Sequence, residues 1–172
     1  MRLIPTVVNN CVVRRNGDDK LLFVGSVTLP DIVKKKQSLE AFGTLGTVEV
    51  PIEGQLEPLT LSIKATNINK NISIEDGDIV DINIKAALQE IDADTGKTNC
   101  IVNFSSSVKA MVQEIKMGEM KTGSSAETEI TLACTYYRVT IDGKDIYEID
   151  KLNGKYLVNG KDLLADVNRA LS

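Results

Sequence analysis

Acidic side chains are the residues of this sequence whose spacing comes closest to a site of chemistry. Asp92 and Asp94 stand two residues apart just ahead of Gly96, as ligands do at the start of a calcium-binding loop. The twelfth position of such a loop needs a bidentate glutamate, and here it is Asn103. Tight turns also prefer Asp and Gly, so we interpret these residues, and the acidic cluster at 76–81, as turn chemistry and expect no metal site.

The usual parts of a catalytic site are also missing. The 172 residues include no histidine, which is the commonest general base and a frequent zinc ligand. Cys11, Cys100 and Cys134 lie far apart within β-type sequence, and their spacing predicts packed thiols. No phosphate-binding or dinucleotide-binding glycine pattern is present. We therefore expect no enzymatic activity and no cofactor.

The composition fits one domain, residues 1–172, with a core of Val, Ile, Leu and Ala. Hydrophobic residues make up 42% of the chain, aromatic residues only 4%, and tryptophan is absent. The formal charge of -4, with 24 acidic and 20 basic residues, disfavours a broad cationic surface for nucleic acid. No apolar stretch approaches the roughly 20 residues that a membrane span needs, so we expect no membrane partner and synthesis in the cytoplasm.

Hydrophobic and polar residues alternate with period two along most of the chain. The pattern is clearest in residues 78–90 and 99–115, which flank the turn sequence at 92–97 and predict a long hairpin. One face of this hairpin is apolar and the other is small and polar, as in a sheet with one face on the core. Residues 129–136 repeat the alternation. The residues expected to face the core are Ile82, Ile84, Phe104, Val108, Leu132 and Tyr136.

Further patterns extend the antiparallel prediction to the rest of the chain. Residues 7–13, 21–29 and 59–65 read as strands, and Asp142 with Gly143 predicts a type I′ turn. Helix is expected only at residues 162–171, with Asp162 as N-cap, and weakly near residues 67–76. The fold class is therefore mainly β, an antiparallel sandwich or barrel with one short helix.

Residues 34–46 read as a long extended loop, and residues 159–172 as a C-terminal arm. The loop begins with three lysines and ends with Gly43 and Gly46. Either plain surface variation or an intermolecular role fits such a loop. The lysine run is interpreted as a solvated segment or a contact with an acidic protein, in preference to nucleic acid.

Several short sequence motifs, in a fixed order along the chain, give the sequence a specific resemblance to a known family. They are GEMKTG at 118–123, CTYYRVT at 134–140 and DGK at 142–144, with SVTLP at 26–30 and VNG at 158–160. In this order and spacing the chain resembles the major tail tube protein of contractile-tailed phages. The same family includes the tube proteins of R-type bacteriocins, and these motifs do not distinguish a phage protein from a bacteriocin protein.

The resemblance implies hexameric rings that stack into a tube, with the sheets of neighbouring subunits joined into one inner barrel. It implies a surrounding sheath protein, baseplate and tail terminator proteins, and a tape measure protein or DNA in the lumen. The particle would be a virion tail or a bacteriocin, assembled in the host cytoplasm. Together with the alternation of polar and apolar residues, the resemblance predicts which residues line the lumen. They are Asp81, Asn83, Gln89, Asn103, Ser105, Ser107, Thr131 and Thr135. The contact between rings is expected at Lys34, Lys35, Lys36, Leu39, Phe42 and Leu45.

A monomeric β-barrel that binds a ligand or an oligonucleotide is the alternative. Such a module needs exposed aromatic side chains or a basic groove for stacking and for phosphates. The sequence has three Phe and four Tyr, several of them on the core parity. The polymer subunit is therefore the favoured prediction.

Overall fold

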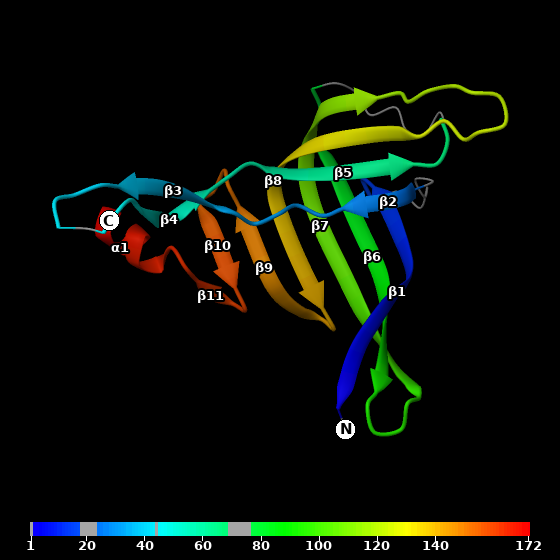
Figure 1. The fold of residues 1–172 in the computed structure, drawn as a ribbon, viewed down its shortest axis with the longest axis horizontal. Helices are drawn as coiled ribbons and strands as arrows, with labels where there is room; N and C mark the ends of the chain where they lie inside the picture. The colour runs from blue at the N-terminus through cyan, green and yellow to red at the C-terminus, as the bar shows by residue number, and fades with distance from the viewer. Residues whose placement is uncertain (1, 18–23, 44, 69–76) are drawn as a thin grey trace.

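Antiparallel strands form almost all of the molecule (Figure 1). The computed structural model describes residues 2–17, 24–43, 45–68 and 77–172. The strands are β1 Leu3–Arg15, β2 Val24–Thr28, β3 Lys34–Leu39, β4 Val48–Leu56, β5 Leu59–Ala65, β6 Val80–Asp92, β7 Thr98–Lys116, β8 Thr128–Ile141, β9 Lys144–Asp150, β10 Lys155–Val158 and β11 Lys161–Asp162, and the helix is α1 Ala165–Leu171.

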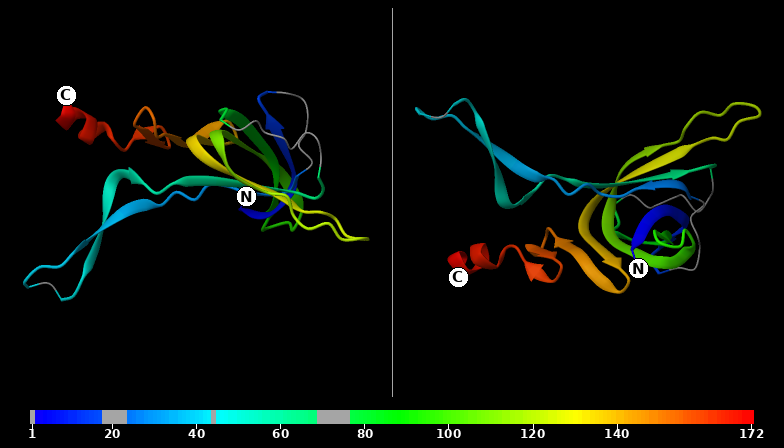
Figure 2. Two further views of the ribbon diagram at one scale, coloured as in Figure 1. Left: turned by 90° about the horizontal axis from the view of Figure 1, so that it is seen from above. Right: turned by 60° about the horizontal axis from the view of Figure 1, so that its bottom comes forward.

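The main sheet has the order β1-β6-β7-β8-β9-β10-β11, and β8 is the strand at which it divides. Along one side β8 pairs with β7. Along the other side its first half pairs with β5 and its second half with β9. Strand β5 also pairs with β2, so β2 and β5 fold across one face of the main sheet (Figure 2). The result is a partly closed barrel, and the mainly β prediction is confirmed.

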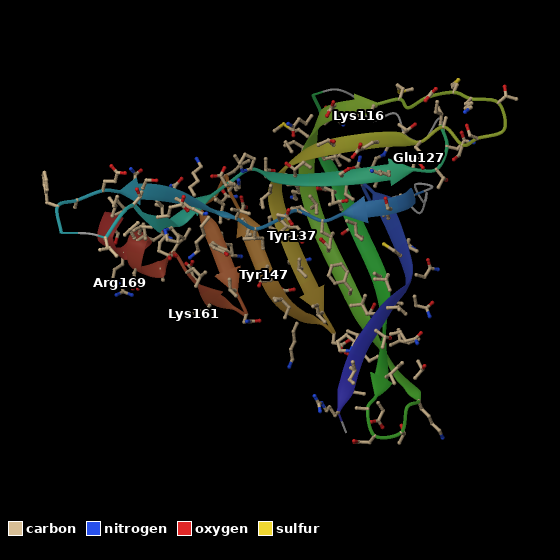
Figure 3. All side chains as sticks on the ribbon, viewed as in Figure 1. Lys116, Glu127, Tyr137, Tyr147, Lys161 and Arg169 are labelled. Atoms are coloured by element: carbon tan, nitrogen blue, oxygen red, sulfur yellow. The ribbon has the colours of Figure 1, made fainter. Side chains whose placement is uncertain are left out.

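The core lies between the β2–β5 layer and the main sheet. Leu61 of β5 stands opposite Leu132 of β8, and both are fully buried. Tyr137 is buried between the same layers (Figure 3). Burial alternates along β5 and along the first half of β6, as the period-two pattern predicted. The core assignments of Ile82, Ile84, Val108 and Leu132 are confirmed, and Phe104 packs against this core while partly exposed.

Two turns follow their sequence signals. Asp142 and Gly143 both have positive φ, 48° and 75°, as a type I′ turn between β8 and β9 requires. In the turn between β6 and β7, the carboxylate of Asp92 accepts hydrogen bonds from the Asp94 amide (3.0 Å) and the Thr95 hydroxyl (3.0 Å). The acidic residue therefore orders the turn.

Residues 34–46 were predicted to be a loop, and that prediction was wrong for the first part of the segment, whereas residues 40–43, 45 and 46 lie outside any strand. Residues 34–39 form β3, which pairs with β4 in a separate two-stranded sheet. The ion pairs Lys34–Glu53 (2.8 Å) and Lys36–Glu49 (3.0 Å) cross this hairpin. Two lysines of the run therefore form cross-strand pairs. The alternation of polar and apolar residues within one strand does not predict which residues of another strand it pairs with.

The C-terminal arm differs from its prediction in one detail. The helix begins at Ala165, three residues after the predicted cap, and Leu164 at its N-cap makes no side-chain hydrogen bond. Asp162 instead ends β11, and its carboxylate accepts a hydrogen bond from the Leu164 amide (2.9 Å). The weakly predicted helix at 67–76 lies mostly outside the described residues, which include only 67 and 68 of it.

Ser106 offers a stability test within the core. It is fully buried between Ile84 and Val139, and its hydroxyl has no hydrogen-bond partner in the described part of the chain. Ser106→Ala should raise the free energy of unfolding by about 1 kcal/mol, because it removes a buried, unsatisfied polar group. Urea denaturation measures this change, with Ser105→Ala on the polar face as a near-neutral control. A loss of stability in Ser106→Ala would show that the hydroxyl is satisfied.

Candidate functional site

The polar face of the main sheet is built from rows of side chains that run across β6, β7, β8 and β9. Asn83, Ser107, Arg138 and Glu148 form one such row, each opposite the next in register. The Ser107 hydroxyl donates a hydrogen bond to the side-chain oxygen of Asn83 at 2.9 Å. Because directly opposed residues share a face in antiparallel pairs, the row is continuous across four strands.

A groove of about 750 Å³ opens on this face where β6 begins. A second row of side chains, next to the first, crosses this groove. It runs from Asp81 through Lys109 and Tyr136 to Asp150. The Lys109 ammonium lies 6.0 Å from the centre of the Tyr136 ring, within the range of a cation–π contact. Both charge signs line the groove, so it presents a mixed polar surface with no single-sign field.

Tyr136 is held at the rim of this groove by Glu148. Its hydroxyl donates to a Glu148 carboxylate oxygen at 3.2 Å, and Lys155 contacts the same oxygen at 2.9 Å. Partial burial and, to a smaller extent, the nearby Glu148 carboxylate raise the pKa of the Tyr136 phenol. The phenol is therefore a neutral hydrogen-bond donor at physiological pH.

The structure brings most of the predicted polar set together. Asp81, Asn83, Ser107 and Thr135 line the groove. Ser105 lies opposite Lys85 and Thr140 in the next row.

Gln89 and Asn103 continue the polar parity toward the turn between β6 and β7, where the Gln89 amide donates to the Thr98 hydroxyl at 3.3 Å. Thr131 lies apart from the other residues of the set. It sits opposite Ser62 in the half of β8 that pairs with β5.

The prediction that Tyr136 faces the core was wrong. The register between β7 and β8 shifts between Lys109 and Ala110, which leaves Thr135 as an extra residue. Beyond that bulge the parity reverses, so Tyr137 is buried and Tyr136 joins the polar face. The sequence carried a signal for this change. Ile130, Leu132 and Cys134 are even-numbered, whereas Tyr137, Val139 and Ile141 are odd-numbered.

The predicted contact residues of the hairpin separate into two groups. Lys34 and Lys36 form the cross-strand ion pairs. The pKa of Lys151 is lowered mainly by burial of its side chain and, to a smaller extent, by the positive charge of Lys35. The apolar members, Leu39, Phe42 and Leu45, are all exposed. The hairpin thus carries an apolar surface that nothing in the described part of the chain covers.

The cysteines were expected to be packed thiols, and two of them can be placed. Cys134 is buried, and burial raises the pKa of its thiol to about 11. Cys11 is exposed, so the expectation was wrong for this residue. The side chain of Cys100 lies outside the described part. In the part of the chain that the structure describes, no three His, Cys, Asp or Glu side chains gather as a metal site would need, and no helix is long and apolar enough to cross a membrane.

A model of the phage tail tube protein FII family matches residues 5–171. The chain belongs to this family. It is therefore a structural tail tube subunit of a bacteriophage-type contractile particle, as the resemblance of its sequence predicted.

Two relatives support the same assignment. The tail tube protein of Escherichia phage P2 is 31% identical over 149 residues, which is 84% of each chain. The major tail tube protein of Serratia phage KSP20 is 26% identical over 151 residues, 88% of this chain and 86% of the relative.

The fold is similar to chains in an extracellular contractile injection system (PVC). In its extended sheath–tube complex the TM-score is 0.51 at 17% identity, covering 80% of this chain and 90% of the other. In its sheath/tube terminator the TM-score is 0.50 at 19% identity, covering 80% and 96%. These likenesses show that the tail tube fold is shared.

Proposed function

We propose that this tail tube subunit forms hexameric rings that stack into the inner tube of a contractile tail, with the polar face of the main sheet lining the lumen. The observation that carries the proposal is the set of polar rows across β6, β7, β8 and β9, which lie opposite the apolar core. A sheet with one apolar and one polar face can bury the first and present the second to water. The proposed lining set is Asp81, Asn83, Gln89, Asn103, Ser105, Ser107 and Thr135, with Thr131 further along β8, beside β5.

The electrostatics of this face suit a conduit. Its cations alternate with carboxylates, as Lys109 does with Asp81 and Asp150, and Arg138 does with Glu148. Tight binding to a phosphate backbone requires a surplus of cations that release counterions, and these rows provide none. DNA or a tape measure protein would therefore slide through the lumen without adhering.

The remaining partners follow from the family. The structural relatives come from complexes described as a sheath–tube complex and a sheath/tube terminator. We infer that this chain likewise contacts a sheath on the outside of the tube, a terminator at one end and a baseplate at the other. The chain is a structural protein without catalytic activity, and its assembly takes place in the host cytoplasm. We infer that one domain spans residues 1–172 and carries the β3–β4 hairpin, which is a separate two-stranded sheet, and the arm at 159–172, which includes β11 of the main sheet.

Electron microscopy of the purified protein tests the proposal. Negatively stained samples at high concentration, with and without preformed tail initiators, should show rings or tubes, and sedimentation velocity should show the corresponding large species. A tube subunit can wait for a template, so both conditions are needed. Protein that stays monomeric in both would refute the proposal and favour the monomeric binding module.

A further inference from the structure

The hairpin of β3 and β4 has one apolar face with no partner in the described part of the chain. Leu39 lies opposite Val48, and Val50 and Ile52 continue the same parity of β4. These side chains are 51%, 48%, 40% and 38% exposed in that order. Gln37 of β3, opposite Val50, is a polar residue on this face, and the opposite face carries the Lys36–Glu49 ion pair. A two-stranded hairpin is only marginally stable in water without packing, so this face requires a covering surface.

The tip of the hairpin is apolar as well. Phe42 and Leu45 are fully exposed there, and residues 41–45 contain no charged side chain. The adjacent carboxylate, Glu40, accepts a hydrogen bond from the Thr47 hydroxyl at 2.8 Å. The other projecting segments differ, because charged residues flank the exposed apolar side chains of the loop between β7 and β8 and of α1. The tip therefore suits an uncharged apolar cavity.

Such a cavity lies on the far side of the molecule, between β1, β2, β6 and β7. It has a volume of about 350 Å³, and its lining contains no charged or amide side chain. The lining residues used in the argument are Val8, Cys11, Val27, Leu29, Leu88 and Phe104. Val8 is exposed, and so is the thiol of Cys11. The cavity is therefore open to an incoming side chain.

The tip and the cavity of one chain cannot meet each other. The hairpin projects from the side of the barrel opposite β1 (Figures 1 and 2). We propose that the hairpin tip of one copy, through Phe42 and Leu45, inserts into the apolar cavity of a second copy. This inference rests on the proposed polymer and names the surfaces that join its subunits. Because tip and cavity are different surfaces, each copy has one of each, and the contact can propagate through a ring or a stack.

A heterotypic cross-linking experiment tests the contact. The double variant Cys11→Ser/Phe42→Cys carries a thiol at the tip and none in the cavity, and wild-type chains supply Cys11. The two are mixed with wild type in excess under tube-forming conditions, treated with a short bismaleimide and digested. Mass spectrometry should find peptides joining residue 42 of one copy to Cys11 of the other. Leu45→Cys in the same background keeps Phe42 and is a second reporter.

Two control variants, together with electron microscopy of the same mixtures, distinguish the possible outcomes. Cys11→Ser/Phe42→Cys without wild type should give no link to residue 11, and Lys36→Cys on the charged face of the hairpin should not reach Cys11. Tubes seen by electron microscopy without a link from either tip position would overturn the inference and leave the proposed function standing. An absence of tubes in every mixture would overturn the proposed function and the inference together.

Discussion

Gly118→Ala should lower the free energy of unfolding by roughly 3 kcal/mol. Gly118 has φ of +79°, and a β-carbon there would collide with the backbone carbonyl of Glu127. The two residues face each other at the base of the loop between β7 and β8, where the Thr128 hydroxyl also donates to the Met117 carbonyl at 3.4 Å. Figure 3 shows Lys116 and Glu127 on either side of this base.

Gly123→Ala is the matched control, because it lies in the same loop with a similar φ of +82° and nothing within 4 Å of an added β-carbon. It should cost only the conformational term, about 1 kcal/mol. Guanidinium denaturation followed by circular dichroism gives both values. Equal losses in the two variants would show that the close backbone approach at Gly118 has no energetic consequence, and that the loop base relaxes freely.

Local patterns were sufficient for the elements whose two faces differ strongly. Residues 59–65 were predicted as a strand, and β5 has those bounds because its apolar residues all enter one core. The hairpin of β6 and β7 and the turn at Asp142 and Gly143 were also predicted, since alternation and turn chemistry act over short distances.

Long-range register was beyond the sequence. The bulge at Thr135 lies where β8 changes partner from β5 to β9. The switch of apolar parity after Cys134 indicates the bulge, but no local pattern specifies which strand becomes the new partner. The bulge brings Tyr136 to the polar face beside Lys109. The rows on this face also contain Arg138 and Glu148, which were not among the residues predicted for the site. The β3–β4 hairpin was missed for a related reason. Its apolar face stays exposed in the single chain, so alternation there does not report a core within the chain.

Strand β1 ends the main sheet in the described part of the chain, and under the proposed function its outer edge is where a neighbouring subunit would pair. Among residues 2–17, 24–43, 45–68 and 77–172, the strand that pairs with β1 is β6, along one side. The Asn16 amide donates to the Asp81 carbonyl at 2.7 Å, and the register is regular from Asn10 to Arg15, so the Val12 amide also points toward β6. The Cys11 amide points outward, and in the free chain it donates to the Asn10 side chain at 2.8 Å. A neighbouring subunit's strand would use that outward edge.

Cys11→Pro should accordingly abolish rings and tubes while leaving the subunit folded. Proline removes the outward donor and places its ring where a neighbouring strand would pair, and an edge position facing solvent tolerates it in the monomer. The lost hydrogen bond alone costs about 1 kcal/mol at each junction, and every junction of a cyclic ring carries the same defect. Circular dichroism should still report β-structure, while sedimentation velocity and electron microscopy should report monomers.

Two neighbouring substitutions separate this effect from others. Cys11→Ser changes the same side chain but keeps the amide, so it should polymerise like wild type. Val12→Pro removes a donor that points at β6, so it should destabilise the subunit itself, because the lost bond belongs to the internal ladder. If Cys11→Pro assembled as readily as Cys11→Ser, the sheets of adjacent subunits would not join through the outer edge of β1, and the continuous inner barrel would need a different junction.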